Sequence, residues 1–205
     1  MPDPSRSDTP NRILDAAAAL VRTGGLEAVT FDSVAAQLGV SKQAVIYWFP
    51  SKLTLLSALA LPSLRSEARV AVDAAAGASG PGEAAGAVVR ALIGFHLSDL
   101  ARFRLMYLSP QIGATASARR TAAGLVQQVH PVTGEMYAAV AAALGGGAEA
   151  RQTAVALHMA ALGHVLLVAL TEALGDPLSH PPDALADRLA SVLAAGASSD
   201  TAKAR

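Results

Sequence analysis

The stretch TFDSVAAQLGVSKQAVIYWFPSK, residues 30–52, decides the fold of the N-terminal part of the chain. Thr30 can cap a short helix, and Gly39 after it offers the positive φ of a tight turn. Ser41 can cap a second short helix, which Pro50 ends because the residue before a proline is pushed out of the α region. The pattern predicts two short helices that meet at a tight turn.

The second of these helices has an apolar side and a polar side. Val45 and Phe49 lie four residues apart and therefore share a face, which we expect to join Val34, Leu38 and Val40 in a small core. The side chains expected to face solvent are Lys42, Gln43, Tyr47 and Trp48.

The outward side chains suit contact with DNA. Lys42 can reach guanine acceptors or phosphate, Gln43 is the residue type that reads adenine with two hydrogen bonds, and Ala44 can touch a thymine methyl. Tyr47 and Trp48 are costly to leave facing water unless sugar, phosphate or base edges meet them, although Trp48 can alternatively belong to the core. The helix pair is typical of a helix-turn-helix whose second helix enters the major groove.

The charge distribution around this motif favours a polyanion. The chain has no net charge, yet the residues from Ser33 to Leu64 include no acid and only two cations, Lys42 and Lys52. Lys52 lies in the first turn of the next helix, capped by Ser51, where the helix dipole disfavours a cation. A phosphate bound there would resolve the conflict, and a merely solvated Lys52 is the alternative.

Composition predicts an all-α fold. The 205 residues include 47 alanines and 27 leucines against 17 valines and 4 isoleucines, a bias towards good helix formers. Cysteine is absent, which excludes disulfides, thiolate metal sites and cysteine catalysis and fits a reducing compartment. The longest apolar stretch, residues 154–170, is shorter than the roughly 20 residues that span a bilayer. We therefore expect a buried helix there and a cytoplasmic protein without membrane contact.

Helical spacing of apolar residues organises the whole chain. A first helix starts at residue 9 and ends at Gly24, and the helices expected after the motif cover residues 52–76, 83–100, 102–108, 115–144, 148–174 and 182–195. The predicted domains are a disordered arm (1–8), a DNA-binding domain (9–52), a helical effector-binding and dimerisation domain (53–195) and a disordered tail (196–205).

The second domain offers candidates for an effector pocket. Large or pliable apolar groups and a few histidines can line an apolar cavity with polar anchors, the alternatives being core packing and surface positions. These residues are Phe95, His96, Phe103, Met106, Tyr107, His130, Met136, Tyr137, His158 and Met159. No acid lies within helical reach of His158 or His164, so no metal site is predicted. The last two helices are more apolar than a monomer needs, which predicts a four-helix seam with a second copy.

The motif residues Thr30 to Ala35, Leu38 to Ala44 and Tyr47 to Lys52 resemble the DNA-binding domain of the TetR family of bacterial repressors, over residues 12–56. The resemblance implies a three-helix DNA-binding domain followed by a helical ligand-binding and dimerisation domain. It also implies that Lys42, Gln43, Ala44, Tyr47 and Trp48 face the major groove and that Thr30, Ser41 and Lys52 meet phosphates. Ile46 stands where the family most often has a tyrosine that bonds the DNA backbone, so Tyr47 or Trp48 takes over that contact, or affinity is lower.

The expected function is therefore a homodimeric, ligand-responsive transcriptional repressor that binds a palindromic operator and is released by a small, largely apolar effector. An architectural DNA-binding protein without an effector and an all-α carrier of small hydrophobic molecules are the alternatives. An enzyme is disfavoured because the chain lacks a phosphate loop, a nucleophile elbow and a His-Glu-x-x-His pair. His96 with Asp99 is the only acid–base pair at helical spacing worth naming. No catalytic residue, cofactor or metal is predicted.

Overall fold

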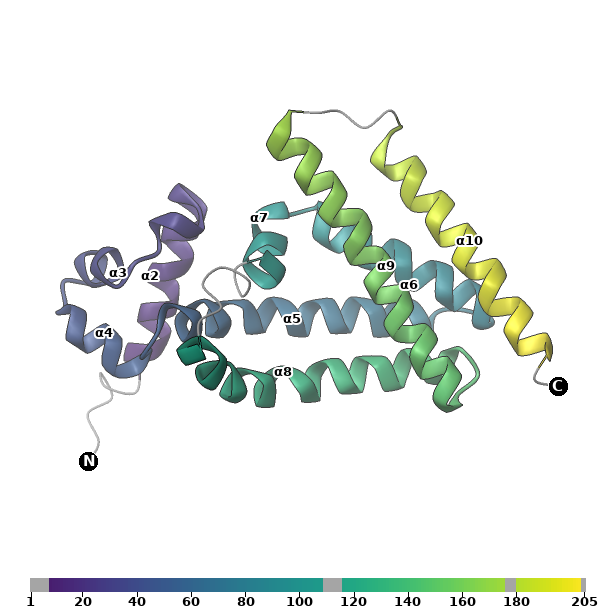
Figure 1. The fold of residues 1–205 in the computed structure, drawn as a ribbon, viewed down its shortest axis with the longest axis horizontal. Coiled ribbons are helices and arrows are strands. Elements are labelled where there is room, and N and C mark those ends of the chain that lie inside the picture. Colours follow the sequence, from purple (N-terminus) through teal and green to yellow (C-terminus); the bar gives the residue numbers. More distant parts are fainter. Residues whose placement is uncertain (1–7, 109–115, 176–179, 204–205) are drawn as a thin grey trace. The chain divides into compact units, whose positions relative to one another are not determined.

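The computed structural model describes residues 8–108, 116–175 and 180–203, and within these ranges the chain is helical and contains no strand (Figure 1). The predicted all-α fold is confirmed. Except for Asp8, the predicted N-terminal arm lies outside the described residues.

The chain separates into two compact units. The first draws on Met1–Leu64 and Ala101–Val129, and the second on Arg65–Leu100 and His130–Arg205. The predicted boundary at residue 52 marks the end of the helix-turn-helix motif and stays a prediction. The helices Lys52–Ala76 and Ala116–Ala143 each begin in the first unit and end in the second. At these two places the units are linked by a continuous helix and not by a loop.

The first unit opens with the helices that the sequence predicts. They are α2 (Thr9–Gly24), α3 (Phe31–Leu38) and α4 (Lys42–Trp48), followed by the start of α5 (Lys52–Ala76). A short 3₁₀ turn that the sequence did not predict, η1 (Leu26–Ala28), lies between α2 and α3. Later segments complete the unit: all but the first residue of α7 (Leu100–Phe103), the π-helical turn η2 (Arg104–Leu108) and the start of α8 (Ala116–Ala143).

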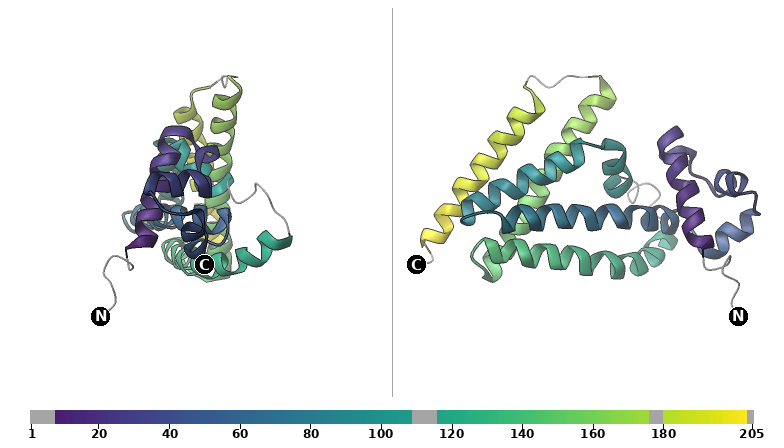
Figure 2. Two further views of the ribbon diagram at one scale, coloured as in Figure 1. Left: turned by 90° about the vertical axis from the view of Figure 1, so that its left-hand side faces the viewer. Right: turned by 180° about the vertical axis from the view of Figure 1, so that it is seen from behind.

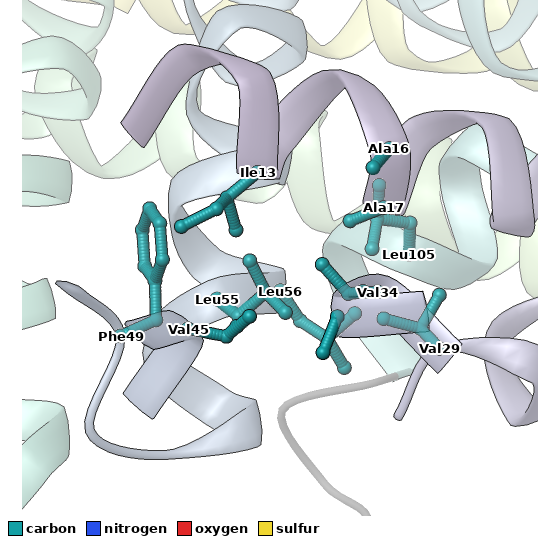
Figure 3. Packing of buried hydrophobic residues seen from close by; sticks show 11 residues of the cluster. Ile13, Ala16, Ala17, Val29, Val34, Val45, Phe49, Leu55, Leu56 and Leu105 are labelled. Atoms are coloured by element: carbon teal, nitrogen blue, oxygen red, sulfur yellow. The ribbon is translucent and has the colours of Figure 1, made fainter. Parts of the chain in front are cut away.

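A small apolar core holds α2, α3, α4 and the start of α5 together (Figure 3). Val45 of α4 and Val34 of α3 are fully buried, and Phe49 closes the end of α4 at 7% exposure. The core residues are Ile13, Ala16, Ala17, Val29, Val34, Ala35, Val45, Phe49, Leu55, Leu56 and Leu105. Val40, which the sequence places in this core, is 38% exposed because it lies in the turn rather than on either helix face.

The second unit is built around α6 (Pro81–Leu97). It also contains α9 (Gly147–Leu174) and α10 (Pro182–Lys203), together with the ends of α5 and α8. Helix α6 packs against both α9 and α10, which also contact each other, and the right-hand view of Figure 2 shows α10 next to α6.

The helix α10 runs through Lys203 and not only to residue 195, so most of the segment predicted to be a disordered tail is helical. Its end packs closely on the start of α6: a Cβ at Gly82 would collide with Ser198 Oγ and lie 2.8 Å from the Ala194 carbonyl oxygen. The prediction fails here because it weighed only the polar composition of the tail, whereas alanines continue the helix and the missing side chain of Gly82 gives it a surface to pack on.

Helix α9 agrees with the predicted helix over 148–174 to within one residue and extends beyond the apolar run 154–170 on both sides. By length and composition alone it can cross a membrane, as can two pairs of consecutive helices, α4 with α5 and α6 with α7 and η2, if each bent pair counts as one span. The expectation that this segment is too short is therefore wrong, because the helix continues beyond residues 154–170 on both sides. Only about a third of the apolar 18-residue part of α9 is buried within the protomer.

Candidate nucleic-acid interface and buried polar cluster

Helix α4 and its neighbour α3 are held in place by capping hydrogen bonds. Thr30 Oγ1 accepts the backbone N–H of Ser33 at 3.0 Å, while Ser33 Oγ lies 2.9 Å from the Thr30 nitrogen and accepts its N–H. Ser41 Oγ accepts the N–H of Ala44 at 3.2 Å, which starts α4. Between the two helices Gly39 is left-handed (φ 67°, ψ 32°), a conformation in which other side chains are strained.

The polar side of α4 faces solvent as the sequence predicts. Lys42 and Gln43 are exposed, Ala44 is half-buried, and Tyr47 is 78% exposed. Trp48 is 38% exposed and meets the Tyr47 ring edge-on, with ring centroids 5.3 Å apart. Two large aromatic side chains at the surface, held against each other beside an amide and an ammonium group, form a patch able to stack on sugars and to hydrogen-bond base edges.

Lys42 is not the isolated cation that the sequence suggests. Its Nζ forms an exposed ion pair with Asp32 Oδ2 at 2.8 Å. Asp32 lies one residue outside the acid-free stretch, and the packing of α3 against α4 brings it to the recognition side. The positive potential of this surface is therefore partly neutralised before any polyanion arrives.

The three residues assigned to phosphate contacts all have intramolecular roles. Thr30 and Ser41 use their hydroxyl oxygens as helix caps, and the Thr30 hydroxyl also donates to Ser33 Oγ at 3.0 Å. Lys52 Nζ donates to the Leu26 carbonyl at 3.2 Å, which ties the start of α5 to η1. The Leu26 carbonyl therefore stabilises the Lys52 ammonium group, which the helix dipole disfavours, without a bound phosphate. Thr30, Ser41 and Lys52 are all exposed on the first unit.

A buried polar cluster joins four helices of the second unit. Glu67 of α5 is fully buried, and its Oε1 lies 2.9 Å from the Nε2 atoms of both His96 on α6 and His158 on α9. On its other side, the His158 ring places Nδ1 2.7 Å from the hydroxyl of Tyr137 on α8. We call Tyr137, His158, Glu67 and His96 the polar cluster.

Glu67 remains ionised in this environment. Burial raises the pKa of its carboxyl group, but the hydrogen bonds from His158 and His96 and their positive charge outweigh burial and lower the pKa from 4.5 to about 2. Burial also raises the pKa of Tyr137, and the charge of Glu67 raises it further against the opposing effect of Arg151. The hydrogen bonds from both imidazoles stabilise this buried carboxylate.

The residues predicted to line an effector pocket separate into several groups. His96, Tyr137 and His158 are brought together by Glu67, and Phe95 contacts the His96 ring at 5.0 Å. In the first unit the rings of Phe103 and Tyr107 lie 5.5 Å apart. The members that are buried are His96, Phe103, Met106, Met136 and His158, and Phe95, Tyr107 and Tyr137 are half-buried.

Two members of the predicted pocket do not lie inside the protomer. Met159 is 68% exposed and His130 is also exposed. Met159 follows the buried Leu157 and His158, and the further step of about 100° along the helix turns its side chain to the outer side of α9. Among the described residues no group of three or more His, Asp or Glu is arranged to hold a metal ion.

Sequence reasoning missed Glu67 and Asp32. Neither has its partners within one helix: Glu67 lies 29 residues from His96 and 91 from His158, and Asp32 lies ten from Lys42. A signal for Glu67 is nevertheless present, because it precedes the buried Ala71 by four residues and so places a charge on an apolar helix face. Asp32 carries no such signal, since first-turn acids are ordinary.

Comparison with known proteins supports the interpretation of α2 to α5. Residues 13–59 match the family model described as bacterial regulatory proteins of the tetR family. No curated protein matches the chain in sequence.

Solved structures resemble the chain over nearly its whole length. A TetR/AcrR-family transcriptional regulator from Thermobifida fusca is 24% identical with a TM-score of 0.53, over 91% of this chain and 97% of that one. The regulator FadR from Bacillus subtilis, in complex with stearoyl-CoA, is 14% identical with a TM-score of 0.64, over 91% and 98%. The multidrug binding protein EbrR, complexed with imidazole, is 24% identical with a TM-score of 0.62, over 93% and 96%.

These likenesses establish the fold, and the matched N-terminal residues are those that build the capped helix pair and its exposed recognition side. Residues 13–59 of the chain are therefore similar to the tetR family of bacterial regulatory proteins, and the chain as a whole shares the fold of these solved structures.

Proposed function

We propose that the protein is a homodimeric transcriptional repressor that binds a near-palindromic operator through α4 and is released by a small effector bound in the second unit. The observation that carries the proposal is the division of α4: Val45 is fully buried, while Gln43 and Tyr47 on the same short helix are exposed. A helix anchored on one side and polar on the other is what insertion into a major groove requires.

We assign reading and positioning roles to different residues. Gln43 reads adenine, Ala44 contacts a thymine methyl, and Lys42 reaches guanine or phosphate once its ion pair with Asp32 opens. Tyr47 and Trp48 lie against sugar and phosphate and make the backbone contact of the family's tyrosine, whose position Ile46 occupies in this chain. The phosphate contacts fall to Thr30, Ser41 and Lys52.

The dimer is proposed to form through α9 and α10. Apolar side chains on one stripe of α9 are exposed in the protomer, with Met159, Leu166, Leu167, Leu170 and Leu174 between 43% and 70%, and α10 adds Val192 at 53%. Such a stripe is a liability for a monomer and an interface for a two-fold pair. Two copies of α4 about 34 Å apart would then meet successive major grooves.

A membrane span is the rival explanation for the apolar α9. The opposite side of this helix packs against α6 and carries His158, which hydrogen-bonds the ionised Glu67, so that face belongs to a protein interior. Only the exposed stripe needs covering, and a second copy of the same stripe covers it symmetrically. We expect Leu170→Glu to convert the dimer to a monomer in sedimentation experiments, while Ala138→Glu, on an exposed position of α8 outside the proposed interface, leaves it dimeric. A monomeric or lipid-dependent parent protein would contradict the dimer.

The effector is proposed to bind in the second unit near the polar cluster. The fold-level neighbours FadR and EbrR hold stearoyl-CoA and imidazole, which supports ligand binding by this architecture and leaves the effector of this chain to experiment. An effector weakens DNA binding only through its differential affinity for the two states of the dimer. A cytoplasmic location follows from the proposed role.

The decisive test is selection of DNA from a random pool by the purified full-length protein. We expect a near-palindromic consensus with half-sites about one helical turn, or a multiple of it, apart. Gln43→Ala should then cost about 1–3 kcal/mol at one base pair in each half-site and relax the preference there. Recovery of no consensus, or of a single half-site, would contradict the proposal that the protein binds a near-palindromic operator.

A further inference from the structure

The geometry of the polar cluster limits where its hydrogens can lie. An ionised carboxylate has no hydrogen to give, so Glu67 Oε1 can only accept, and both His96 and His158 carry a hydrogen on Nε2. When Nε2 carries the single hydrogen of the His158 ring, its Nδ1 atom is an acceptor. In that form of the cluster the Tyr137 hydroxyl, 2.7 Å away, donates its hydrogen to His158.

This chain of donors determines what Tyr137 offers to anything else. Its hydrogen is used on the inner side, so its oxygen has only lone pairs left. Tyr137 is half-buried, whereas Glu67 is fully buried and His158 is 5% exposed, so the phenol is the member through which the cluster meets its surroundings. The negative charge of Glu67 is felt at the phenol, since it raises the pKa of Tyr137.

We propose that His158 carries a single hydrogen, on Nε2, and that Glu67 is a positioning residue of the effector site, which thereby makes the Tyr137 oxygen a pure acceptor and selects effectors that carry a hydrogen-bond donor, neutral or cationic, over anions. The proposal rests on the effector site of the proposed function and narrows its ligand class. The Glu67 carboxylate orients both imidazoles and supplies the field that favours a positive group, without touching the effector itself. A phenol oxygen that can only accept hydrogen bonds discriminates strongly between ligands, because a ligand that also can only accept would place two acceptors against each other.

The first test locates the hydrogens in the free full-length protein. Two-bond ¹H–¹⁵N spectra of ¹⁵N-histidine-labelled protein at pH 8 distinguish protonated from unprotonated ring nitrogens, with His96→Gln and His158→Gln used for assignment. We expect His158 to be protonated on Nε2 only. A proton on its Nδ1 atom, whether alone or in a doubly protonated ring, would overturn the proposal, because Tyr137 would then have its hydrogen free to donate outward.

The second test measures ligand preference with two probes of similar size, benzylamine and benzoate, by calorimetry at pH 8. We expect benzylamine to bind at least about tenfold more tightly than benzoate, the ratio that one hydrogen bond involving a charged group provides. Tyr137→Phe removes the acceptor and should abolish most of that ratio. Glu67→Gln keeps an accepting oxygen but removes the charge, and should reduce the ratio while the Nε2–H signals persist.

Equal or tighter binding of benzoate, no binding of benzylamine, or an unchanged ratio in Tyr137→Phe would overturn the ligand class. If Glu67→Gln fails to fold, the wild-type spectra and Tyr137→Phe still decide the question. Neither test contains DNA, so a missing operator would refute the proposed function and leave these results standing. Conversely, a failed probe series leaves operator binding intact.

Discussion

Removing the Lys42 ammonium group should reveal how many copies of α4 sit on one operator. In the free protein Lys42 Nζ pairs with Asp32 at 2.8 Å, but both side chains are well exposed, 45% and 71%, so Lys42→Ala costs at most about 1 kcal/mol of stability. The protein stays folded, and the effect on DNA binding can be measured without a loss of structure.

The magnitude follows from counterion release. Each cation that neutralises a phosphate contributes about 0.9 to the slope of log affinity against log salt. One copy of α4 on the DNA predicts a slope change of about 0.9, and two copies predict about 1.8. When salt rises from about 50 to about 200 mM, the affinity of the variant should fall about 12-fold less than that of the parent if two copies of α4 contact the DNA. With one copy, its affinity should fall about 3.5-fold less.

The assay is fluorescence anisotropy of the selected operator titrated at four salt concentrations. Arg69→Ala is the matched control, because it removes one exposed cation from α5 within the second unit. We expect it to leave the slope unchanged. A Lys42→Ala slope equal to that of Arg69→Ala would show that Lys42 stays with Asp32 on DNA, and would refute the assignment of Lys42 to the groove or to phosphate.

Three further predictions concern stability and are measured by urea unfolding. Val45→Ala removes a fully buried side chain from the α4 core and should cost about 2–3 kcal/mol, whereas Val40→Ala, at a 38% exposed position, should cost less than about 1 kcal/mol. Gly82→Ala forces a Cβ against Ser198 and the Ala194 carbonyl and should cost about 1–3 kcal/mol. At Gly86, where the nearest atom is the mobile Arg90 guanidinium at 3.3 Å, alanine should be neutral or stabilising by up to about 1 kcal/mol through helix propensity. The pKa of Glu67 is lowered from 4.5 to about 2, so its ionised form contributes stability above pH 4.5 that is lost as the pH falls towards 2, roughly 3 kcal/mol in all. Wild type should therefore lose more stability than Glu67→Gln between pH 5 and pH 2.5, and parallel losses would contradict the ionised buried carboxylate.

The parts of the fold that were predictable are those in which neighbouring residues decide the backbone. Thr30 and Ser41 cap α3 and α4, and Gly39 takes the left-handed turn between them, as expected from their spacing alone. The helix α3 begins and ends at the predicted residues, Phe31–Leu38, because a cap and a glycine define both of its ends. Local chemistry of this kind is readable in the sequence without knowledge of what packs where.

Prediction was weaker where a distant surface decides the outcome. The extension of α10 depends on the absence of a side chain at Gly82, more than one hundred positions earlier in the chain, and glycine in a helix gives no hint of which helix will approach it. The outward direction of Met159 was accessible in principle, because its neighbours His158 and Ala161 are buried on the other side of α9. Grouping pocket candidates by residue type instead of by helix face is what placed it wrongly.

The polar cluster shows where residue-by-residue reasoning stops. Each histidine considered alone is more often a surface or structural residue, and Glu67 considered alone is one acid in a long helix. Only the packing of α5, α6 and α9 converts three unremarkable positions into a carboxylate held by two imidazoles at 2.9 Å. Both histidines hydrogen-bond the buried, ionised Glu67, so the effects of substituting the three residues on stability should not be additive. Removing either histidine alone should destabilise the protein more than replacing all three residues with apolar residues of similar volume.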